Sequence, residues 1–275
     1  MCYNVENQLK NEVRVMSETL KIVSFNLRCS YEGDGVNSFI HRAGSILDKI
    51  NSEQPDIICA QEAVPSHVKF LRKNLTDYIT IYNGRNADFG GEGLGLLIKK
   101  SRINLIGLDF FWLSETPYVP ASRFAEQSGC PRICQVAMLQ IDGTDKIFYV
   151  YNNHLDHKSD SARILGIRQV LERVKADNER MPFPLFILGD FNATPDSETI
   201  QYCYNYKPVE LVDHTTHIPT TFHRHGTLDY DEKIDYIFTD KATAPKVKSV
   251  EAWDDVLNGI YLSDHYPVSM TVELD

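Results

Sequence analysis

Six short polar segments, each at the end of an apolar run or inside one, carry carboxylates, amides and imidazoles. They lie at residues 24–26, 61–62, 153–157, 189–192, 233–236 and 263–265. Side chains at strand ends often share one crevice of a fold, so we expect these segments to meet. Carboxylate and amide oxygens hold hard divalent cations, and carboxylates and imidazoles transfer protons. The six segments together therefore predict a shared polar site that could hold a divalent cation and transfer protons.

Glu62 follows Asp-Ile-Ile-Cys-Ala-Gln, a pattern typical of a buried strand that ends on a carboxylate. At such a strand end the side chain would face a cleft and could bind a cation through oxygen. Asn26 closes an apolar run in the same way. The alternative interpretation is a solvated loop carboxylate for Glu62 and an ordinary turn residue for Asn26.

The string Gly-Asp-Phe-Asn at 189–192 follows directly on the run Pro-Leu-Phe-Ile-Leu. The glycine would permit a sharp turn from strand to loop. Asp190 and Asn192 can face the same side of the chain. There the carboxylate could accept a proton from water, and the amide could donate a hydrogen bond to a phosphoryl oxygen. A simple Asx turn is the alternative.

Asp235 lies inside an apolar run, where an unpaired carboxylate would be costly to bury. We expect His265 to be its partner, because an Asp–His hydrogen bond fixes the imidazole tautomer and favours the charged ring. Asp264 would then be free to contribute to a metal site. Taken alone, Ser-Asp-His also fits a loop that merely precedes a strand.

His154 ends another apolar run and could bind or protonate a phosphoryl oxygen if a carboxylate orients it. Glu92, in a glycine-rich segment, is the candidate orienting group. Arg132 offers a fork-shaped donor for phosphate, and Asn153 is a further candidate for hydrogen bonding to substrate. Exposed surface positions are the alternative interpretation of Glu92 and Arg132.

Ten apolar runs of strand length are expected to position these residues: 20–27, 56–61, 95–99, 103–112, 133–141, 147–154, 185–188, 234–239, 247–252 and 267–272. Apolar residues recur at helical spacing within 39–50 and 164–174. Many strands and few helices predict an α/β fold of two sheets packed face to face, with helices on the outer faces. We expect residues 19–275 to form one domain and residues 1–18 to be a disordered leader.

The composition, with 43% apolar and 24% charged residues among 275, disfavours a disordered or membrane-spanning chain. A net charge of -10 would repel a polyanion at long range, which disfavours processive work on duplex DNA. The six cysteines are scattered without metal-binding spacing, so we expect reduced thiols. The first twenty residues lack the apolar stretch of a secretory signal. We therefore expect a cytoplasmic monomer without a membrane span.

The order of the polar segments, from the strand ending in Asn to the final Ser-Asp-His, resembles the endonuclease/exonuclease/phosphatase superfamily. The resemblance runs from about residue 20 to the C-terminus. The strings at 112–117, 153–157 and 189–197 resemble a bacterial branch known mostly at superfamily level. One position departs from the pattern, because residue 153 is Asn where Thr is common. The resemblance implies a four-layer α/β sandwich, deoxyribonuclease I-like and mostly antiparallel, with its site at one end of the sheets.

The resemblance also implies a role for each matching residue. The ligands of Mg²⁺ or Mn²⁺ would be Glu62, Asn26 and Asp264. The catalytic groups would be Asp190 and Asn192 around the attacking water and phosphate, His154, and the pair of Asp235 and His265. Arg132, Asn153 and Glu92 would contact the substrate or orient such contacts. The implied activity is hydrolysis of a phosphodiester or phosphomonoester in a nucleic acid, a phospholipid head group or a small phosphorylated metabolite.

Two other functions stay open. His154, Asp156 and His157 partly match the H-x-H-x-D-H string of dinuclear zinc hydrolases, although Asn152 breaks that string. A non-catalytic scaffold with the same fold could bind a phosphorylated partner without turnover. The presence of every expected catalytic residue type argues against the scaffold.

Overall fold

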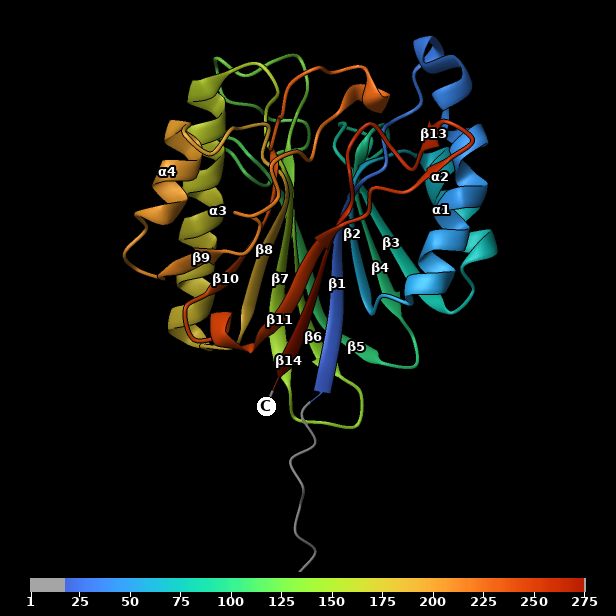
Figure 1. The fold of residues 1–275 in the computed structure, drawn as a ribbon. Helices are drawn as coiled ribbons and strands as arrows, with labels where there is room; N and C mark the ends of the chain where they lie inside the picture. Colours follow the sequence, from blue (N-terminus) through green and yellow to red (C-terminus); the bar gives the residue numbers. More distant parts are fainter. Residues whose placement is uncertain (1–17, 275) are drawn as a thin grey trace, which may run out of the picture.

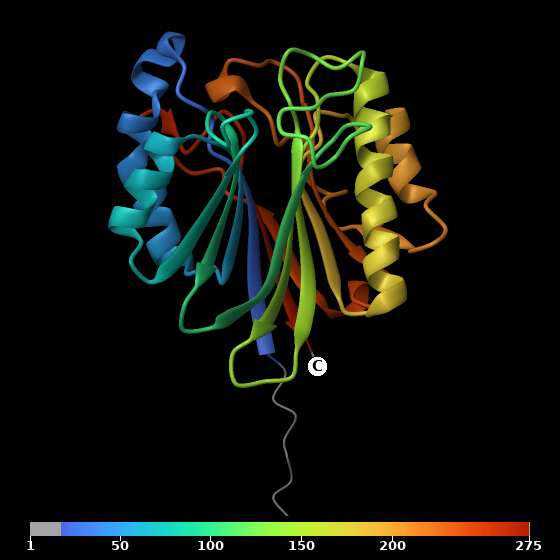
Figure 2. The same cartoon turned by 180° about the vertical axis from the view of Figure 1, so that it is seen from behind.

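Two six-stranded sheets lie face to face in the computed structural model, and helices cover both outer faces (Figure 1). Figure 2 shows the same four layers from behind. The structure describes residues 18–274, so the leader expected at 1–18 lies outside the described residues except for Glu18, which begins the first strand. The predicted α/β sandwich of four layers is confirmed.

The strands of each sheet come from both halves of the chain. The first sheet has the order β11-β14-β1-β2-β4-β3, formed by β1 (Glu18–Asn26), β2 (Ile57–Ala63), β3 (Tyr78–Gly84), β4 (Gly93–Lys99), β11 (Val247–Ala252) and β14 (Val268–Leu274). The second has the order β5-β6-β7-β8-β10-β9, formed by β5 (Ile103–Trp112), β6 (Ile133–Ile141), β7 (Ile147–His154), β8 (Leu185–Asp190), β9 (Leu211–Asp213) and β10 (Asp235–Asp240). A short hairpin joins β12 (Val256–Leu257) to β13 (Ile260–Tyr261).

Four helices form the outer layers. They are α1 (Phe39–Glu53) and α2 (Pro65–Asn74) over the first sheet, and α3 (Asp160–Arg180) and α4 (Glu198–Tyr204) over the second. Short 3₁₀ segments occur at η1 (Glu32–Asn37), which is interrupted at Gly35, and at η2 (Arg224–Gly226) and η3 (Ala244–Lys246). Between the sheets, Ile22 and Leu96 pack with Phe148 and Leu188. Burial contributes roughly 1.5–3 kcal/mol for each such side chain.

Each sheet has one parallel pair at its centre, and a helix connects the two strands of that pair. β1 and β2 are parallel and joined through α1, whereas β7 and β8 are parallel and joined through α3. The other strand pairs of both sheets are antiparallel. The carboxyl ends of parallel strands lie at one edge of a sheet. This topology brings Asn26, Glu62, His154 and Asp190 to the same end of the molecule.

Some elements differ from the sequence prediction. The structure adds α2, α4, β3, β9 and the short hairpin, and β2 extends through Ala63 instead of ending at residue 61. α2 buries only three side chains over ten residues, and β3 lies at a sheet edge with mixed burial, so neither has a strong apolar pattern. β5, β6, β7 and β11 match their predicted bounds to the residue.

No helix among residues 18–274 combines the length and apolarity needed to cross a bilayer. Within the same range the cysteines are free thiols, at Cys29, Cys59, Cys130, Cys134 and Cys203. Cys2 lies outside the described residues.

Candidate active site

The polar strand ends surround one cavity of about 390 Å³. Eight residues predicted from the sequence line it: Glu62, Glu92, Arg132, His154, Asp190, Asn192, Asp264 and His265. Three other predicted residues, Asn26, Asn153 and Asp235, are buried and support the lining from behind or from a neighbouring strand. The structure therefore brings Glu62 and Asp190, which belong to different sheets, to a common space.

Glu62 is directed into the cavity by a bulge. It has a left-handed backbone with φ of 54°, and the β2–β4 register shifts between Ala60 and Ala63. A bulge inserts an extra residue and re-aims its side chain. Burial alone would raise the pKa of Glu62, but the Cys29 N–H at 2.8 Å and the nearby His265 and Arg28 charges lower it to about 2. The carboxylate is therefore charged at every physiological pH.

Asn26 connects the two sheets. Its Nδ2 donates to Glu62 Oε1 at 3.2 Å and to Asp190 Oδ2 at 3.1 Å, while its Oδ1 accepts from the Arg28 backbone N–H. A cation would need the amide oxygen, which points away from the two carboxylates. This geometry favours a positioning role for Asn26 over the metal-ligand role expected from the sequence.

Asp190 lies at the end of β8, only 1% exposed, between two imidazoles. Its Oδ2 is 3.4 Å from His154 Nε2 and 3.9 Å from His265 Nε2, and its Oδ1 accepts from the Asn192 backbone N–H at 2.8 Å. Burial and the neighbouring Asp235 raise the pKa of Asp190 to about 7, against the lowering effect of His265. A carboxyl group with a pKa near neutrality is suited to general-base work.

The Asp235–His265 pair forms as the sequence predicts. His265 Nδ1 lies 2.8 Å from Asp235 Oδ2, and both residues are buried. Burial alone would lower the pKa of His265, but Asp235, Asp190 and Asp264 raise it to about 10. The imidazolium is the favoured form, and its Nε2 faces Asp190.

His154 has the opposite electrostatic surroundings. Burial, together with the charges of Arg132 and Arg85, lowers its pKa well below the usual value. Its Nδ1 is 3.8 Å from Glu92 Oε1, and Arg132 Nη1 is 3.0 Å from its Nε2. Glu92 also accepts a hydrogen bond from Arg85. Glu92 thus pairs mainly with the two arginines, and its contact with His154 is the longer one.

Asn192 and Asp264 both line the cavity and are held by different contacts. Asn192 has a left-handed backbone with φ of 49°, and its Nδ2 donates to the Leu155 carbonyl. Asp264 Oδ2 lies 3.5 Å from Arg28 Nη1. Arg28 is itself fixed by Asp34 through two hydrogen bonds. The guanidinium therefore already compensates the Asp264 charge that the sequence assigned to a metal.

Asn153 does not reach the cavity, contrary to its assignment to substrate binding. It is fully buried, and its Nδ2 donates to the Leu188 carbonyl at 2.8 Å. Neighbouring residues of a strand face opposite sides, so Asn153 turns away where His154 turns in. The Asn153 backbone also explains Gly189, since a Cβ there would lie 2.0 Å from the Asn153 carbonyl oxygen. The glycine serves close strand packing as well as the turn.

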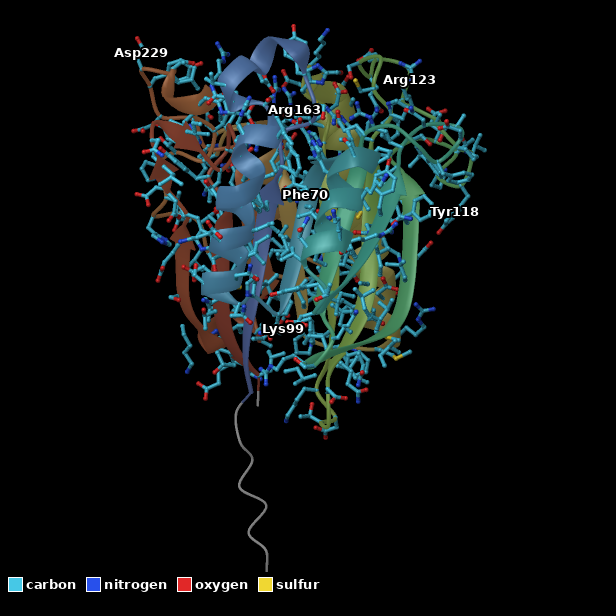
Figure 3. The ribbon with its side chains drawn as sticks, turned by 90° about the vertical axis from the view of Figure 1, so that its right-hand side faces the viewer. Phe70, Lys99, Tyr118, Arg123, Arg163 and Asp229 are labelled. Atoms are coloured by element: carbon cyan, nitrogen blue, oxygen red, sulfur yellow. The ribbon has the colours of Figure 1, made fainter. Side chains whose placement is uncertain are left out.

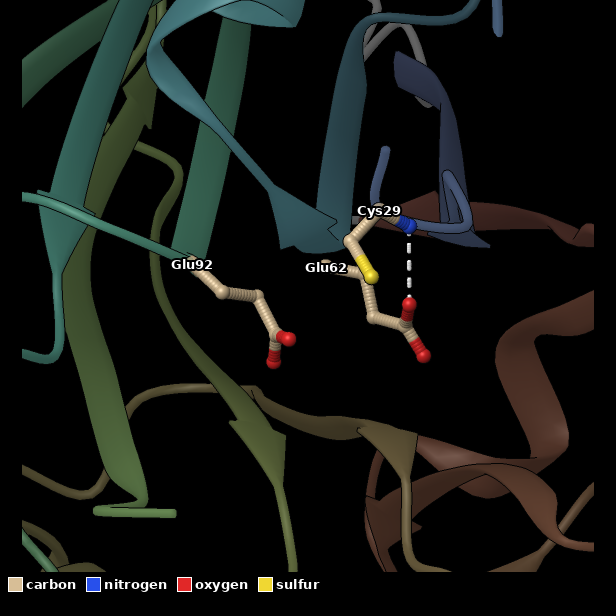
Figure 4. Close-up of side chains that lie close together, drawn as sticks. All are labelled: Cys29, Glu62 and Glu92. Atoms are coloured by element: carbon tan, nitrogen blue, oxygen red, sulfur yellow. Dashed lines mark hydrogen bonds between the residues drawn. The ribbon is translucent and has the colours of Figure 1, made fainter. Parts of the chain in front are cut away.

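Two groups of side chains among residues 18–274 are close enough to share a cation, with ligand atoms within 4.8 Å of one another. One is Glu62, Asp190 and His265. The other is Cys29, Glu62 and Glu92, and Figure 4 shows Glu92 reaching toward the other two. Neither group includes Asp156 or His157, on which the zinc interpretation depends. Asp156 accepts backbone hydrogen bonds before α3, and His157 Nδ1 lies 3.1 Å from Arg132.

Several further residues line the cavity without a predicted role in phosphoester hydrolysis. These are Arg28, Cys29, Arg85, Cys130, His157, Phe222, Glu232 and Ile234. Arg28 and Cys29 immediately follow the strand that ends at Asn26, so extending that segment would have found them. Arg85 follows β3, an edge strand that the sequence pattern did not predict. Its position could not be found without that strand.

Arg42 of α1 donates hydrogen bonds to the backbone of loops near the cavity, and its removal should destabilise the fold. It is fully buried and donates to the carbonyls of Leu262 and Leu27 at 2.5 and 3.0 Å, and to that of Asn37. Arg42→Met removes the donor of these three hydrogen bonds. We expect the free energy of unfolding, measured in urea, to fall by roughly 3 kcal/mol.

The control for Arg42→Met is Lys241→Met, whose ion pair with Glu210 is exposed and should contribute little. Equal stability of Arg42→Met and the parent protein would contradict the bracing role.

Comparison with known proteins adds to this geometry. The sequence model of the Endonuclease/Exonuclease/phosphatase family matches residues 23–265. An endonuclease/exonuclease/phosphatase structure from Bacteroides vulgatus superposes with a TM-score of 0.84 at 26% identity, covering 94% of this chain and 100% of that one. The structure of a mannosyl-6-phosphatase from Bacteroides thetaiotaomicron superposes with a TM-score of 0.81 at 26% identity, covering 91% of this chain and 98% of that one. Tyrosyl-DNA phosphodiesterase 2 from Danio rerio is 23% identical over 175 residues, which span 62% of this chain and 42% of that protein.

Proposed function

The chain belongs to the endonuclease/exonuclease/phosphatase family, and from that premise we propose that it is a Mg²⁺- or Mn²⁺-dependent hydrolase of phosphoric esters. One observation carries the proposal: Glu62 from the first sheet, Asp190 from the second and His265 from the segment before β14 hold their ligand atoms within 4.8 Å of one another. A carboxylate pair with an imidazole next to guanidinium groups suits an anionic ester and an attacking water.

The donor set fits a hard cation. Two carboxylates provide oxygen ligands at the centre of the cavity, and no thiolate cluster surrounds them in the described part of the chain. Glu62 would hold the ion, because it is charged and faces the cavity. A divalent cation, when bound, offsets phosphoryl charge as a Lewis acid. Asp264 would contribute only if Arg28 moved aside.

The protein side chains divide the remaining work. Asp190 would take the proton of the attacking water. Its carboxylate is held in place by the Asn192 N–H and by the Asn26 amide. The charged His265, oriented by Asp235, would stabilise the phosphoryl oxygens. Arg132 and the neutral His154 would bind the phosphate from the other side. These roles follow those implied by the family resemblance, except that Asn26 positions the carboxylates and that Asp264 is paired with Arg28.

The raised pKa of Asp190 predicts that kcat/KM depends on pH near neutrality. The base works only when it is deprotonated. At low metal concentration, kcat/KM should therefore fall as the pH decreases through about 7. A bound cation favours the carboxylate. The midpoint should therefore fall as Mg²⁺ is raised. Rate–pH profiles at limiting and saturating Mg²⁺ measure this, and a midpoint that rises with Mg²⁺ would contradict the assignment.

A substrate panel tests the proposed function. It comprises bis-p-nitrophenyl phosphate, plasmid DNA, an abasic-site oligonucleotide, sphingomyelin, inositol phosphates and mannose 6-phosphate, each with Mg²⁺, with Mn²⁺ and with chelator. We expect metal-dependent hydrolysis of at least one small ester, since the cavity of about 390 Å³ and the net charge of -10 favour compact substrates. Binding without hydrolysis of any ester would favour the scaffold.

A further inference from the structure

A second cavity, of about 440 Å³, opens between the first turns of α1 and α2. We call it the α1–α2 groove. Its walls are the side chains of Tyr31, Phe39, Ile40 and Phe70, with His67 and serine hydroxyls at the margin. Figure 3 looks onto these two helices and labels Phe70 where they meet. The mechanism proposed above uses none of these side chains.

The groove lies next to the catalytic cavity, because neighbouring residues of the same two chain segments line the two spaces. After β1, Arg28 and Cys29 line the cavity and the next residue, Ser30, lines the groove. After β2, Glu62 lines the cavity and His67 lines the groove. The Cys29 N–H donates to Glu62 at 2.8 Å, and Ser30 Oγ lies 3.1 Å from His67 Nε2. Consecutive Cα atoms are about 3.8 Å apart, so the wall between the two spaces is thin.

The groove presents surfaces suited to a planar ring. The Phe39 ring stacks on His67 with centroids 3.8 Å apart, and Phe70 meets Phe39 edge-on at 5.6 Å. The Arg28 guanidinium lies 5.6 Å from the centre of the Tyr31 ring, which is 61% exposed. Aromatic groups bind flat surfaces of this kind through stacked and edge-on contacts.

Polar groups at the border of the groove favour a ring with a polar edge over an alkyl chain. Ser30, Ser38 and Ser66 border the groove, and Ser30 Oγ lies 3.1 Å from His67 Nε2. A polar group that loses water without gaining a hydrogen bond is costly. A ring with a polar edge can exchange hydrogen bonds with these hydroxyls, whereas an alkyl chain covers them without offering a partner.

We propose that the α1–α2 groove binds the leaving group of the substrate, and that this group carries an aromatic ring joined to the phosphate by a short spacer. The inference rests on the proposed function, because it places the scissile phosphate in the neighbouring cavity. An arylalkyl alcohol and a nucleoside both meet this description, since each is released as an alcohol that carries a ring.

Calorimetric binding to the full chain with Mg²⁺ tests the proposal without requiring turnover. The probes are methylphosphonate, hexylphosphonate and 3-phenylpropylphosphonate, with adenosine monophosphate to separate a base from a simple aryl group. The wild-type protein should prefer phenylpropyl over hexyl. Tyr31→Ala and Ile40→Ser should each reduce the ratio of methyl to phenylpropyl dissociation constants about tenfold, or roughly 1.4 kcal/mol. Both positions are exposed, at 61% and 73%, so the variants should fold.

Leu257→Ser is the matched control, since Leu257 is also an exposed aliphatic residue and lines a different cavity beside α1. Loss of adenosine monophosphate binding in Tyr31→Ala would identify a base as the ring, and loss confined to phenylpropyl would identify an aryl group. An equal or greater preference for hexyl, an unchanged ratio in both groove variants, or an equal loss in Leu257→Ser would overturn the groove assignment. Ring preference in a protein that hydrolyses no ester would overturn the hydrolase proposal instead.

Discussion

Replacement of Asp190 by asparagine should lower kcat about a thousandfold at saturating Mg²⁺, within the roughly 10²–10⁴-fold range of general-base catalysis. The amide keeps the size of the side chain and can still accept the Asn192 N–H, but it cannot take a proton from water. Asp190 has few alternatives nearby, because Glu62 has a pKa of about 2 and is a poor base. The rate should not recover at higher metal concentration.

The control for this variant is Asp196→Asn, six residues further along the same loop, where the carboxylate is exposed and accepts from Thr194. Steady-state rates of both variants on the best ester of the panel provide the measurement. If Asp190→Asn kept more than about a tenth of the parental kcat, another group would have to be the base.

The strands and their polar ends could be predicted because a buried strand has an apolar sequence, and polar residues at its end interrupt that pattern visibly. β7 and β8 show this most clearly, since each is buried along its length and stops at His154 or Asp190. The pairing of Asp235 with His265 could also be predicted, because burying a carboxylate without a partner is unfavourable. Thirty residues separate the two in sequence, and no periodic pattern connects them.

Other features depend on tertiary contacts that a local pattern does not contain. Arg28 and Arg85 resemble surface arginines in the sequence, and they acquire a place in the cavity only because Asp34 and Glu92 hold them there. Asn153 lies outside the cavity although it is adjacent to His154 in sequence, because neighbouring residues of a strand face opposite sides. The bulge at Glu62 has no signature in Ala-Gln-Glu-Ala, yet it decides where the carboxylate points.

The site also shows why chemistry and stability are coupled in this fold. Asn26 donates to carboxylates from both sheets, so it ties the layers together at the point where they carry like charges. Arg42 does the same for the loops that bear Arg28 and Asp264, through the Leu27 and Leu262 carbonyls. Substitutions at these two positions should therefore reduce both activity and the free energy of unfolding.

Replacement of Glu62 by glutamine should act on metal binding instead of proton transfer. Glutamine keeps the shape and one oxygen to accept the Cys29 N–H, but it removes a charge that is present at all physiological pH values. We expect the Mg²⁺ or Mn²⁺ concentration for half-maximal rate to rise at least about tenfold, since even outer partners of metal ligands contribute roughly 10–100-fold. Unlike Asp190→Asn, this variant should recover much of its rate when the metal is raised.

Glu232→Gln provides the matched control, because Glu232 also lines the cavity but belongs to neither group of residues close enough to share a cation. Rates measured across a metal titration should give the same half-saturating concentration for Glu232→Gln as for the parent protein. An unchanged metal dependence in Glu62→Gln would remove Glu62 as the principal ligand. Of the other two members of its group, His265 favours the charged form, which has no lone pair for a cation, so Asp190 alone would remain to hold the ion. That arrangement is weaker by Coulomb's law, so the shift in Glu62→Gln is the sharpest single test of where the metal binds.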